Sequence, residues 1–463
     1  MDHKMNRLPL YIGLGALFAL PGSALAADKV AVDELVVIAQ EEAEAQDVPM
    51  GQGVGSEVNL LPGESGAVDD GIFGTEGGYI HPYISLTEFF TDNVFNVDTD
   101  TTSSFITRIS PGIWLSIPRK REIPVGLAPN NTSPGGLAQQ IADYEGSDRY
   151  QVYALTGADI TMYSDDSDFN TEDYFAEGLG RYNMPGGLSL QIVDRVTNGH
   201  DIFETGVTTS DNIREFNRNL LMLTADWDLT EKFRVKTDYS NFYLDYDAAG
   251  DAFLNRQDNI FDLYTYFKYS VKTSVFVQYR HTDVSYDTAT ETDNTQNSYF
   301  GGIRYESTEK LSLLFKAGLQ DKSFTNEAPG FDDSSNLAMD LQATYRITEK
   351  TQIAVAGYRN TEESDSEEAS EREVLGVRLA YEQQITDKIT AKADMHYENA
   401  DYSQLSGFSE REDSSYFLRP AVQYLFRDWL MAEAAYSHET TNSSDDDFDF
   451  DTNIFSVSLN FAL

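Results

Sequence analysis

The feature that most constrains this chain is a repeat of about 39 residues that runs through its C-terminal half. Short polar turns mark the repeat, and one longer acidic segment lies between each two turns. The turns end at Lys232, Lys272, Lys310, Lys350, Lys388 and Asp428. Each repeat is therefore interpreted as strand, long loop, strand and short turn. A solenoid would also repeat, but it would not alternate its loop lengths in this way.

The strands of the repeat alternate apolar and polar residues with period two, as strands with two different faces do. In the last strand Phe455, Val457 and Leu459 share one face, and Ser456 and Ser458 share the other. Other strands carry full charges in the middle of their polar face. Charged residues there fit a water-filled lumen better than the core of a soluble sandwich, so the apolar face is expected to meet lipid.

These patterns predict an all-β fold, namely a transmembrane antiparallel up-and-down β-barrel over residues 78–463. We expect about 18 strands, with 16 as the alternative, joined by short periplasmic turns and longer acidic extracellular loops. Two of the expected strands cover residues 188–197 and 373–384. An even strand number places both termini on the periplasmic side.

Composition supports this class of fold and argues against others. The formal net charge is −44, the aromatic content is 12% and cysteine is absent. The aromatic content argues against a disordered acidic protein, and the lack of cysteine rules out disulfides and thiolate metal sites. The six His residues are scattered and no catalytic motif is apparent. We therefore expect a protein that is not an enzyme and has no cofactor and no fixed metal.

The N-terminus has the pattern of a cleaved signal peptide over residues 1–26. Lys4 and Arg7 precede an apolar run, and small residues end it, so cleavage between Ala26 and Ala27 is expected. Export of a barrel predicts location in the outer membrane of a Gram-negative cell. Residues 27–77 are predicted to form a flexible periplasmic segment.

The C-terminus is predicted to be an assembly signal, because the chain ends on a strand with apolar residues at Phe461 and Leu463. The expected partners are the outer-membrane assembly machinery, outer-membrane lipids and lipopolysaccharide. Nothing in the sequence indicates binding to nucleic acid.

Residues predicted to line the lumen lie on the polar faces of the strands, where charges set the selectivity of a pore. They are Arg108, Trp114, Arg234, Lys236, Arg304, Lys316, Arg346, Arg378, Lys392 and Arg419. Such a lumen would favour an anionic solute, unless its cations are paired in Arg–carboxylate ladders. The acidic runs in the outer loops, among them residues 362–373, are predicted to be solvated surface or, alternatively, calcium sites.

One stretch resembles a known family. Residues 87–95 read TEFFTDNVF and residues 104–113 read SFITRISPGI. They resemble the opening hairpin of a family of outer-membrane β-barrels, of the beta-barrel porin type, that is associated with exopolysaccharide biosynthesis and export operons. The resemblance implies a porin-like barrel that assists export of a polysaccharide, with a periplasmic polysaccharide-export protein as a possible partner.

Three functions remain open at this point. An export conduit predicts a wide lumen, lumen aromatics that stack on sugars, and a docking segment at 118–148 or 27–77. A general diffusion porin for small solutes predicts an inward-folded loop that forms a charged constriction, and no outer loop is obviously long enough, the longest being 198–217. A structural or adhesive barrel predicts a blocked lumen.

Overall fold

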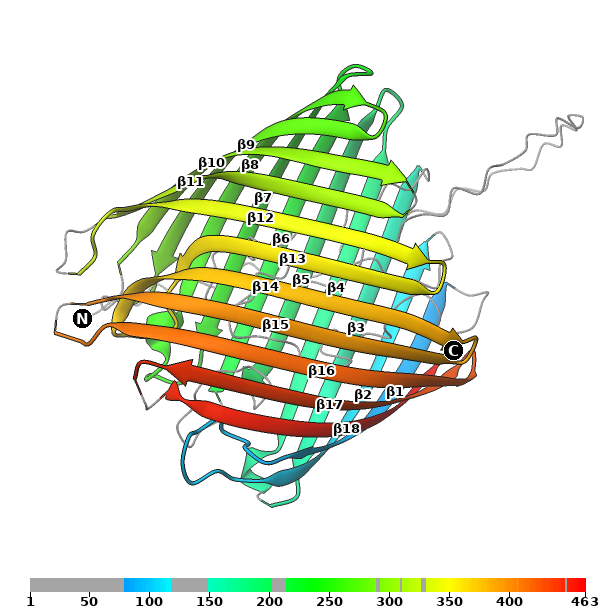
Figure 1. The fold of residues 1–463 in the computed structure, drawn as a ribbon, viewed down its shortest axis with the longest axis vertical. Helices are drawn as coiled ribbons and strands as arrows, with labels where there is room; N and C mark the ends of the chain where they lie inside the picture. The colour runs from blue at the N-terminus through cyan, green and yellow to red at the C-terminus, as the bar shows by residue number, and fades with distance from the viewer. Residues whose placement is uncertain are drawn as a thin grey trace, which may run out of the picture. The chain divides into compact units, whose positions relative to one another are not determined.

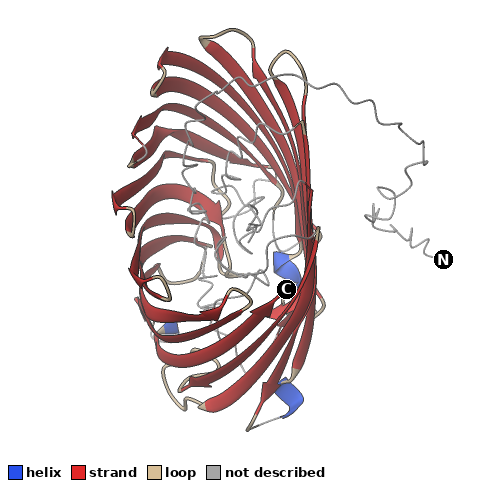
Figure 2. Cartoon of the chain, turned by 90° about the vertical axis from the view of Figure 1, so that its right-hand side faces the viewer, coloured by secondary structure: helices blue, strands red, loops and turns tan. Residues whose placement is uncertain are grey.

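The computed structural model describes residues 79–117, 149–165, 167–201, 214–288, 292–308, 310–325, 330–405, 407–445 and 448–463. Strands make up almost all of them, as Figure 2 shows. The strands are β1 (Ile80–Thr91), β2 (Ser104–Ile117), β3 (Tyr150–Tyr163), β4 (Thr171–Asn183), β5 (Leu188–Asp201), β6 (Arg214–Asp228), β7 (Phe233–Tyr246), β8 (Arg256–Ser270), β9 (Thr273–Tyr286), β10 (Asn294–Thr308), β11 (Leu311–Phe324), β12 (Ser334–Thr348), β13 (Thr351–Glu363), β14 (Ala369–Thr386), β15 (Ile389–Gln404), β16 (Arg411–Arg427), β17 (Leu430–Ser443) and β18 (Phe450–Ala462). Two short 3-10 turns, η3 (Ser167–Phe169) and η5 (Ala252–Leu254), lie in loops.

The strands form one closed antiparallel sheet. Each strand pairs with the next along the chain, and β1 also pairs with β18 from Tyr83↔Ala462 to Thr91↔Ile454. In Figure 1 the yellow to red strands form the near wall of this barrel, and the cyan and green strands form the far wall. Closure removes the two free edges that an open sheet would leave with unpaired backbone groups.

The seam that closes the barrel is reinforced at its loop end by the residues after β1. Asp92 accepts hydrogen bonds from the backbone N–H of Asn453 at 2.7 Å and from its side-chain amide at 2.8 Å. Asn93 donates to the carbonyl oxygen of Asp451 at 3.0 Å. Asp92 and Asn93, which belong to the segment with the family resemblance, therefore link the end of β1 to β18.

The two faces of each strand differ as the period-two pattern predicts. On β18 the side chains of Ser456, Ser458 and Asn460 are buried, whereas those of Phe455 and Val457 are more than half exposed. The apolar side chains thus form the outer surface of the barrel, and the polar side chains face inward. Long polar side chains of strands that are not neighbours meet on this inner face, which only the concave side of a closed sheet allows.

Inward glycines make room for inward aromatic rings on neighbouring strands. The ring of Tyr358 lies over Gly376, where an added Cβ atom would come within 2.0 Å of the ring's Cζ atom. Tyr83 covers Gly112 in the same manner, at 2.1 Å. Each large ring is therefore laid flat along the wall of the barrel, which a side chain at the neighbouring position would prevent.

The predicted fold class is confirmed: the described residues form an antiparallel barrel with the eighteen strands that the repeat indicates. Several strands are longer than predicted. The strand expected at 188–197 is β5 (Leu188–Asp201), and that expected at 373–384 is β14 (Ala369–Thr386). Polar residues occupy both faces near the loop ends, so the alternation fades there although the pairing continues. Residues 1–77 and 118–148 lie outside the described residues. No helix in the described part of the chain is long and apolar enough to cross a membrane.

Candidate functional site: a hairpin folded into the barrel

The barrel wall is interrupted at the loop end between β12 and β13. Pairing of these two strands stops at Met339↔Arg359, although β12 begins five residues earlier at Ser334. Pairing of β13 with β14 continues as far as Glu363↔Glu371. The ends of β12 and β13 diverge at the left of Figure 1. The last residues of β13 and the first of β14, residues 360–372, therefore separate from β12 and bend inward, while β14 stays paired with β15 as far as Ala369↔Gln404. We call these residues the inward hairpin.

Burial of consecutive residues shows where the inward hairpin goes. Glu362 and Glu363 are 0% and 1% exposed, and Glu371 and Arg372 are 4% and 2% exposed. In a barrel wall, neighbouring residues face opposite sides and one of each pair would be exposed. Here both sides are covered, because one side of the hairpin packs on the inner face of β9 to β11 and the other meets inward side chains of β15.

The first covered side is held by the carboxylate of Glu363. Its Oε1 atom lies 2.9 Å from the Nζ atom of Lys322 on β11, and its Oε2 atom accepts a hydrogen bond of 2.6 Å from the hydroxyl of Tyr286 on β9. The amides of Gln296 and Asn294 on β10 also donate to this carboxylate, at 2.8 and 3.1 Å. These partners of Glu363 are all inward side chains of β9, β10 and β11. In the sheet, β12 lies between those strands and β13.

Backbone contacts strengthen the same attachment. Gln320 on β11 donates from Nε2 to the carbonyl oxygen of Thr361 at 2.8 Å, and its Oε1 atom accepts from the Thr361 N–H at 3.1 Å. A single side-chain amide therefore takes the place of the missing β12 ladder at this residue. Glu371 adds a contact to Lys322 of 3.6 Å.

The second covered side is organised around Arg372. Its guanidinium lies 2.9 Å from Glu362, 3.5 Å from Asp365 and 3.9 Å from Glu398 on β15. The hydroxyl of Tyr402 donates to Asp365 at 3.0 Å. A buried arginine needs several acceptors to offset the loss of its hydration, and the hairpin supplies most of them.

Asp365, in the loop between β13 and β14, is strongly affected by this network. Burial by itself raises the pKa of its carboxyl, but the charges of Arg372 and Arg411 and the Tyr402 hydroxyl outweigh burial. The pKa of Asp365 is therefore held below its ordinary value, and the residue is a carboxylate at neutral pH.

The predicted lumen residues lie on the inward face, and most of their charges are matched. The contacts are Arg108 with Thr161, Arg234 with Asp226, Lys236 with Asp238, Lys316 with Asp340, Arg346 with Gln352, Arg378 with Asp394, Lys392 with Glu382, and Arg419 with Glu433. Arg304 is a half-buried inward residue of β10, and Trp114 is buried and stacks on His81 with ring centroids 5.2 Å apart. The alternative of Arg–carboxylate ladders therefore describes this face better than an excess of positive charge.

The sequence pattern places the residues of the inward hairpin in an outer loop and does not indicate their role. The run 362–373 was expected to be solvated surface, and this is wrong for Glu362, Glu363 and Glu371, whose side chains are buried. Their contacts depend on the point at which β12 and β13 separate, which no local pattern marks. One residue in the sequence does point to these contacts. Lys322 is a cation on the inward side of β11 near its loop end, where it needs an acidic partner. In the described residues, no group of three or more His, Cys, Asp or Glu side chains is arranged to hold a metal ion.

The predicted assembly-signal residues lie at the closing seam. Phe461 pairs with Ile84 of β1 and with Leu430 of β17, and its ring stacks on Trp429. Leu463 is 59% exposed, and its backbone N–H donates to the carbonyl oxygen of Pro82 at 3.0 Å. The cleavage site at Ala26 and Ala27 lies outside the described residues.

Comparison with known proteins places the chain in a family. Residues 146–463 match the family model described as "Putative beta-barrel porin 2". Among solved structures, OccK2 (OpdF) of Pseudomonas aeruginosa is 9% identical with a TM-score of 0.43, and the alignment covers 83% of this chain and 98% of that one. OpdK of the same organism, solved with vanillate, is 7% identical with a TM-score of 0.44 and coverage of 83% and 99%. No curated protein matches the sequence. Since the family model spans well over half of the chain, this protein belongs to the beta-barrel porin family and is an outer-membrane β-barrel porin.

Proposed function

We propose that this porin is a diffusion channel for small solutes, in which the inward hairpin narrows the lumen at the extracellular side. The observation that supports this function is the attachment of Glu363 to Lys322 inside the barrel. An eighteen-stranded barrel encloses a lumen wide enough for water unless something fills it. A hairpin fixed on the inner wall restricts the size of what passes without blocking the whole lumen.

The inward hairpin takes the role of the inward-folded loop that a general diffusion porin is expected to have. The loop between β13 and β14 is short, and the strand ends themselves are what bends inward. Buried ion pairs and hydrogen bonds on both sides hold it in one position. The hairpin is therefore fixed against the inner face of the wall and needs no additional chain segment.

Matched charges on the inner face predict weak selectivity between cations and anions. Lys316 faces Asp340, Arg378 faces Asp394 and Arg234 faces Asp226 along the lumen. The two opposite charges of each pair nearly cancel at the distance of a passing ion. Salt in the lumen screens the field that remains. The preference for anionic solutes that the lumen cations alone would imply is replaced by a channel that selects mainly by size.

Assistance to exopolysaccharide export, which the family resemblance implies, stays a prediction. A polymer would have to pass the inward hairpin, and the inward aromatic rings of Tyr264, Tyr266 and Phe276 pack on one another along the wall. The structural or adhesive barrel likewise stays a prediction. The periplasmic export partner and the docking role of residues 118–148 belong with the export hypothesis.

The experiment is planar-bilayer recording of the refolded mature protein, together with swelling of liposomes in sugars of increasing length. The proposal predicts steady conductance, and swelling in mono- and disaccharides that declines as the sugar lengthens. Current that is blocked by polysaccharide fragments and indifferent to small sugars would favour the export conduit instead. Absence of both current and swelling from a folded barrel would contradict the diffusion channel and favour the structural alternative.

A further inference from the structure

We infer that the outer wall formed by β3 to β7 is the contact surface for a second copy of this chain, related by a two-fold axis. Two observations on the outward face of this wall carry the inference. The first is a set of polar side chains at the height of the lipid. The second is an apolar hollow immediately beside them. The inference is independent of whether the lumen conducts.

The polar set is centred on Asp194 of β5. Its neighbours Val193 and Arg195 are buried on the inward face, whereas Ile192 and Val196 are 43% and 37% exposed, so Asp194 faces outward with them. On β4 the outward tyrosines Tyr182 and Tyr174 pair with Leu190 and Asn198. Asp194 is midway between those two positions, inside the band that aromatic residues delimit.

Asparagine side chains surround this carboxylate on the same outward face. Asn219 on β6 donates to Asp194 at 2.9 Å, and Asn198 donates to Asn217 at 3.1 Å. Farther along, Asn241 donates to Asn259 at 3.0 Å. On the wall across the barrel, the outward residues of one comparable row are Val355, Leu379, Met395 and Leu418. That row carries no polar side chain, whereas the row of Asp194 also contains Asn241 and Asn259.

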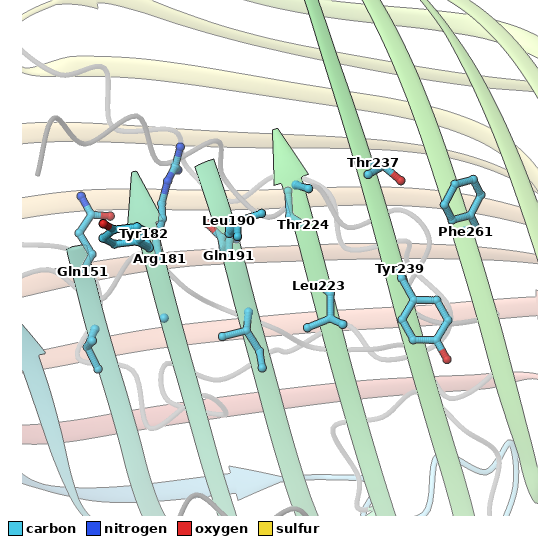
Figure 3. Close-up of a pocket in the computed structure, with 14 residues that line it drawn as sticks. Gln151, Arg181, Tyr182, Leu190, Gln191, Leu223, Thr224, Thr237, Tyr239 and Phe261 are labelled. Atoms are coloured by element: carbon cyan, nitrogen blue, oxygen red, sulfur yellow. The ribbon is translucent and has the colours of Figure 1, made fainter. Parts of the chain in front are cut away.

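A hollow of about 670 Å³ lies one row nearer the short turns. It passes over Gly180, Ile192, Leu223, Tyr239 and Phe261, which follow one another in register across β4 to β8. Figure 3 shows the side chains of Leu223, Tyr239 and Phe261 on adjacent strands. The small residues Gly180 and Ala225 are among those that line the hollow. The outward neighbours of Asp194 across β4 and β3, Gly178 and Ala154, are also small.

Lipid is a poor cover for this wall. A carboxylate that faces hydrocarbon is unfavourable, because lipid tails offer it no hydrogen-bond donor. Small residues that let backbones approach closely, together with polar side chains that hydrogen-bond across the contact, are typical of protein interfaces within membranes. Among the possible covers, another protein surface satisfies both the polar row and the hollow.

A second copy of the same chain supplies the complementary chemistry. Each asparagine amide has both donor and acceptor groups. In a copy related by a two-fold axis, an amide of one chain can therefore form a hydrogen bond with an amide of the other. Asn198 and Asn241, whose amides each make one donor bond in the chain, can donate their second N–H to Asp194 of the opposite copy. The protruding aromatic residues beside the hollow, Tyr182 and Trp227, provide side chains of a size that can enter the partner's hollow. A two-fold contact uses one patch on both copies, as in most homo-oligomers.

Single-cysteine variants test this surface directly, because the native chain has no cysteine. Leu223→Cys places a thiol in the hollow, and Ala176→Cys places one beside the polar row. Leu379→Cys on β14 is the matched control on the other wall. Each full-length mature variant is reconstituted at a high lipid-to-protein ratio and treated with a short bis-maleimide. Folding is checked by the mobility change on heating, and the mass of the uncrosslinked protein in mild detergent is measured by light scattering.

We expect covalent dimers at least tenfold more abundant from Leu223→Cys or Ala176→Cys than from Leu379→Cys, and a mass of two copies in detergent. Asp194→Leu, with Asn219→Leu as a second variant, should remove the dimer and leave a folded monomer. Equal yields from both walls, or a monomer mass for the native protein, would overturn the inference and indicate a lipid-covered wall. A mass of three copies would overturn the two-fold arrangement.

Discussion

Glu363 on β13 places its carboxylate 2.9 Å from the ammonium group of Lys322 on β11, although β12 lies between these two strands in the sheet. The contact is possible because β13 separates from β12 after Arg359 and turns into the barrel. Glu363 is on the side of β13 that would face outward if the strand continued in the wall. The pair therefore marks a local reversal in which an outward position becomes an inner one.

The first prediction concerns this ion pair. Lys322→Met leaves the carboxylates of Glu363 and Glu371 buried without their cation, which costs roughly 3–5 kcal/mol when one partner of a buried pair is removed. Lys350→Met is the matched control, because Lys350 contacts Asp387 at 3.4 Å in an exposed turn and such pairs contribute about 0–1 kcal/mol. The free energy of unfolding in urea, measured in lipid vesicles, should fall markedly in the first variant only. Equal losses in both variants would show that the inner attachment is not a buried pair.

The second prediction concerns pH. Because the pKa of Asp365 is lower in the folded protein than in the unfolded chain, the folded state binds fewer protons at this site. Its contribution to stability is complete above the ordinary aspartate value of about 4 and is lost as the pH falls through the folded value. Urea unfolding midpoints from pH 7 to pH 2.5 should therefore decline less steeply below about pH 4 in Asp365→Asn than in the native protein.

Asp387→Asn serves as the control for this comparison, since the Asp387 side chain is 94% exposed. It should keep the native pH profile. A native profile in Asp365→Asn would mean that the hairpin network does not depend on the charge of this loop carboxylate.

The third prediction concerns the glycine under Tyr358. Gly376→Ala introduces a methyl group 2.0 Å from the Cζ atom of this ring, which also donates from its hydroxyl to Glu398 at 2.6 Å. The ring has to move, and overpacking of this kind costs about 1–3 kcal/mol. Gly357→Ala is the control, because its nearest neighbour is a carbonyl oxygen at 3.9 Å. The unfolding temperature of both variants is measured, and it should be lower for Gly376→Ala. A Gly376→Ala protein as stable as the control would mean that the ring is free to shift.

The fourth prediction concerns the matched charges of the lumen. Arg234 and Asp226 form a bidentate pair on the inward face near the short turns. Arg234→Gln exposes a negative charge and should shift the reversal potential in a salt gradient toward cation selectivity, and Asp226→Asn should shift it toward anion selectivity. The double variant should return close to the native value. Shifts of the same sign in both single variants would show that the two side chains do not act as a pair in the conducting path.

The sequence predicts the barrel well and the constriction poorly, and the reason is physical. The barrel depends on patterns that are local, such as the turns that end at Lys310 and Lys350 and the alternation around Leu313. These repeat many times, so errors at one strand do not change the topology. The same alternation predicts that the side chains of Arg234 and Lys316 point into the barrel.

The inward hairpin depends instead on a balance between distant residues. Whether β13 pairs with β12 to its end or bends inward is decided by the acceptors and donors that Gln320, Lys322 and Tyr286 offer inside the barrel. The acidic residues around Glu363 look like any solvated loop when they are considered without those partners. The outward Asp194 was missed for a related reason, since its strand is otherwise regular.

If the inward hairpin narrows a conducting lumen, its removal must raise the single-channel conductance. Residues 360–372 are replaced by a two-residue turn that joins β13 to β14 at the height where β12 pairing ends. We expect a folded barrel whose conductance is severalfold larger than that of the native protein, and liposomes containing it should swell in longer sugars. Unchanged conductance from the shortened barrel, with its fold verified by heat-dependent mobility, would contradict the claim.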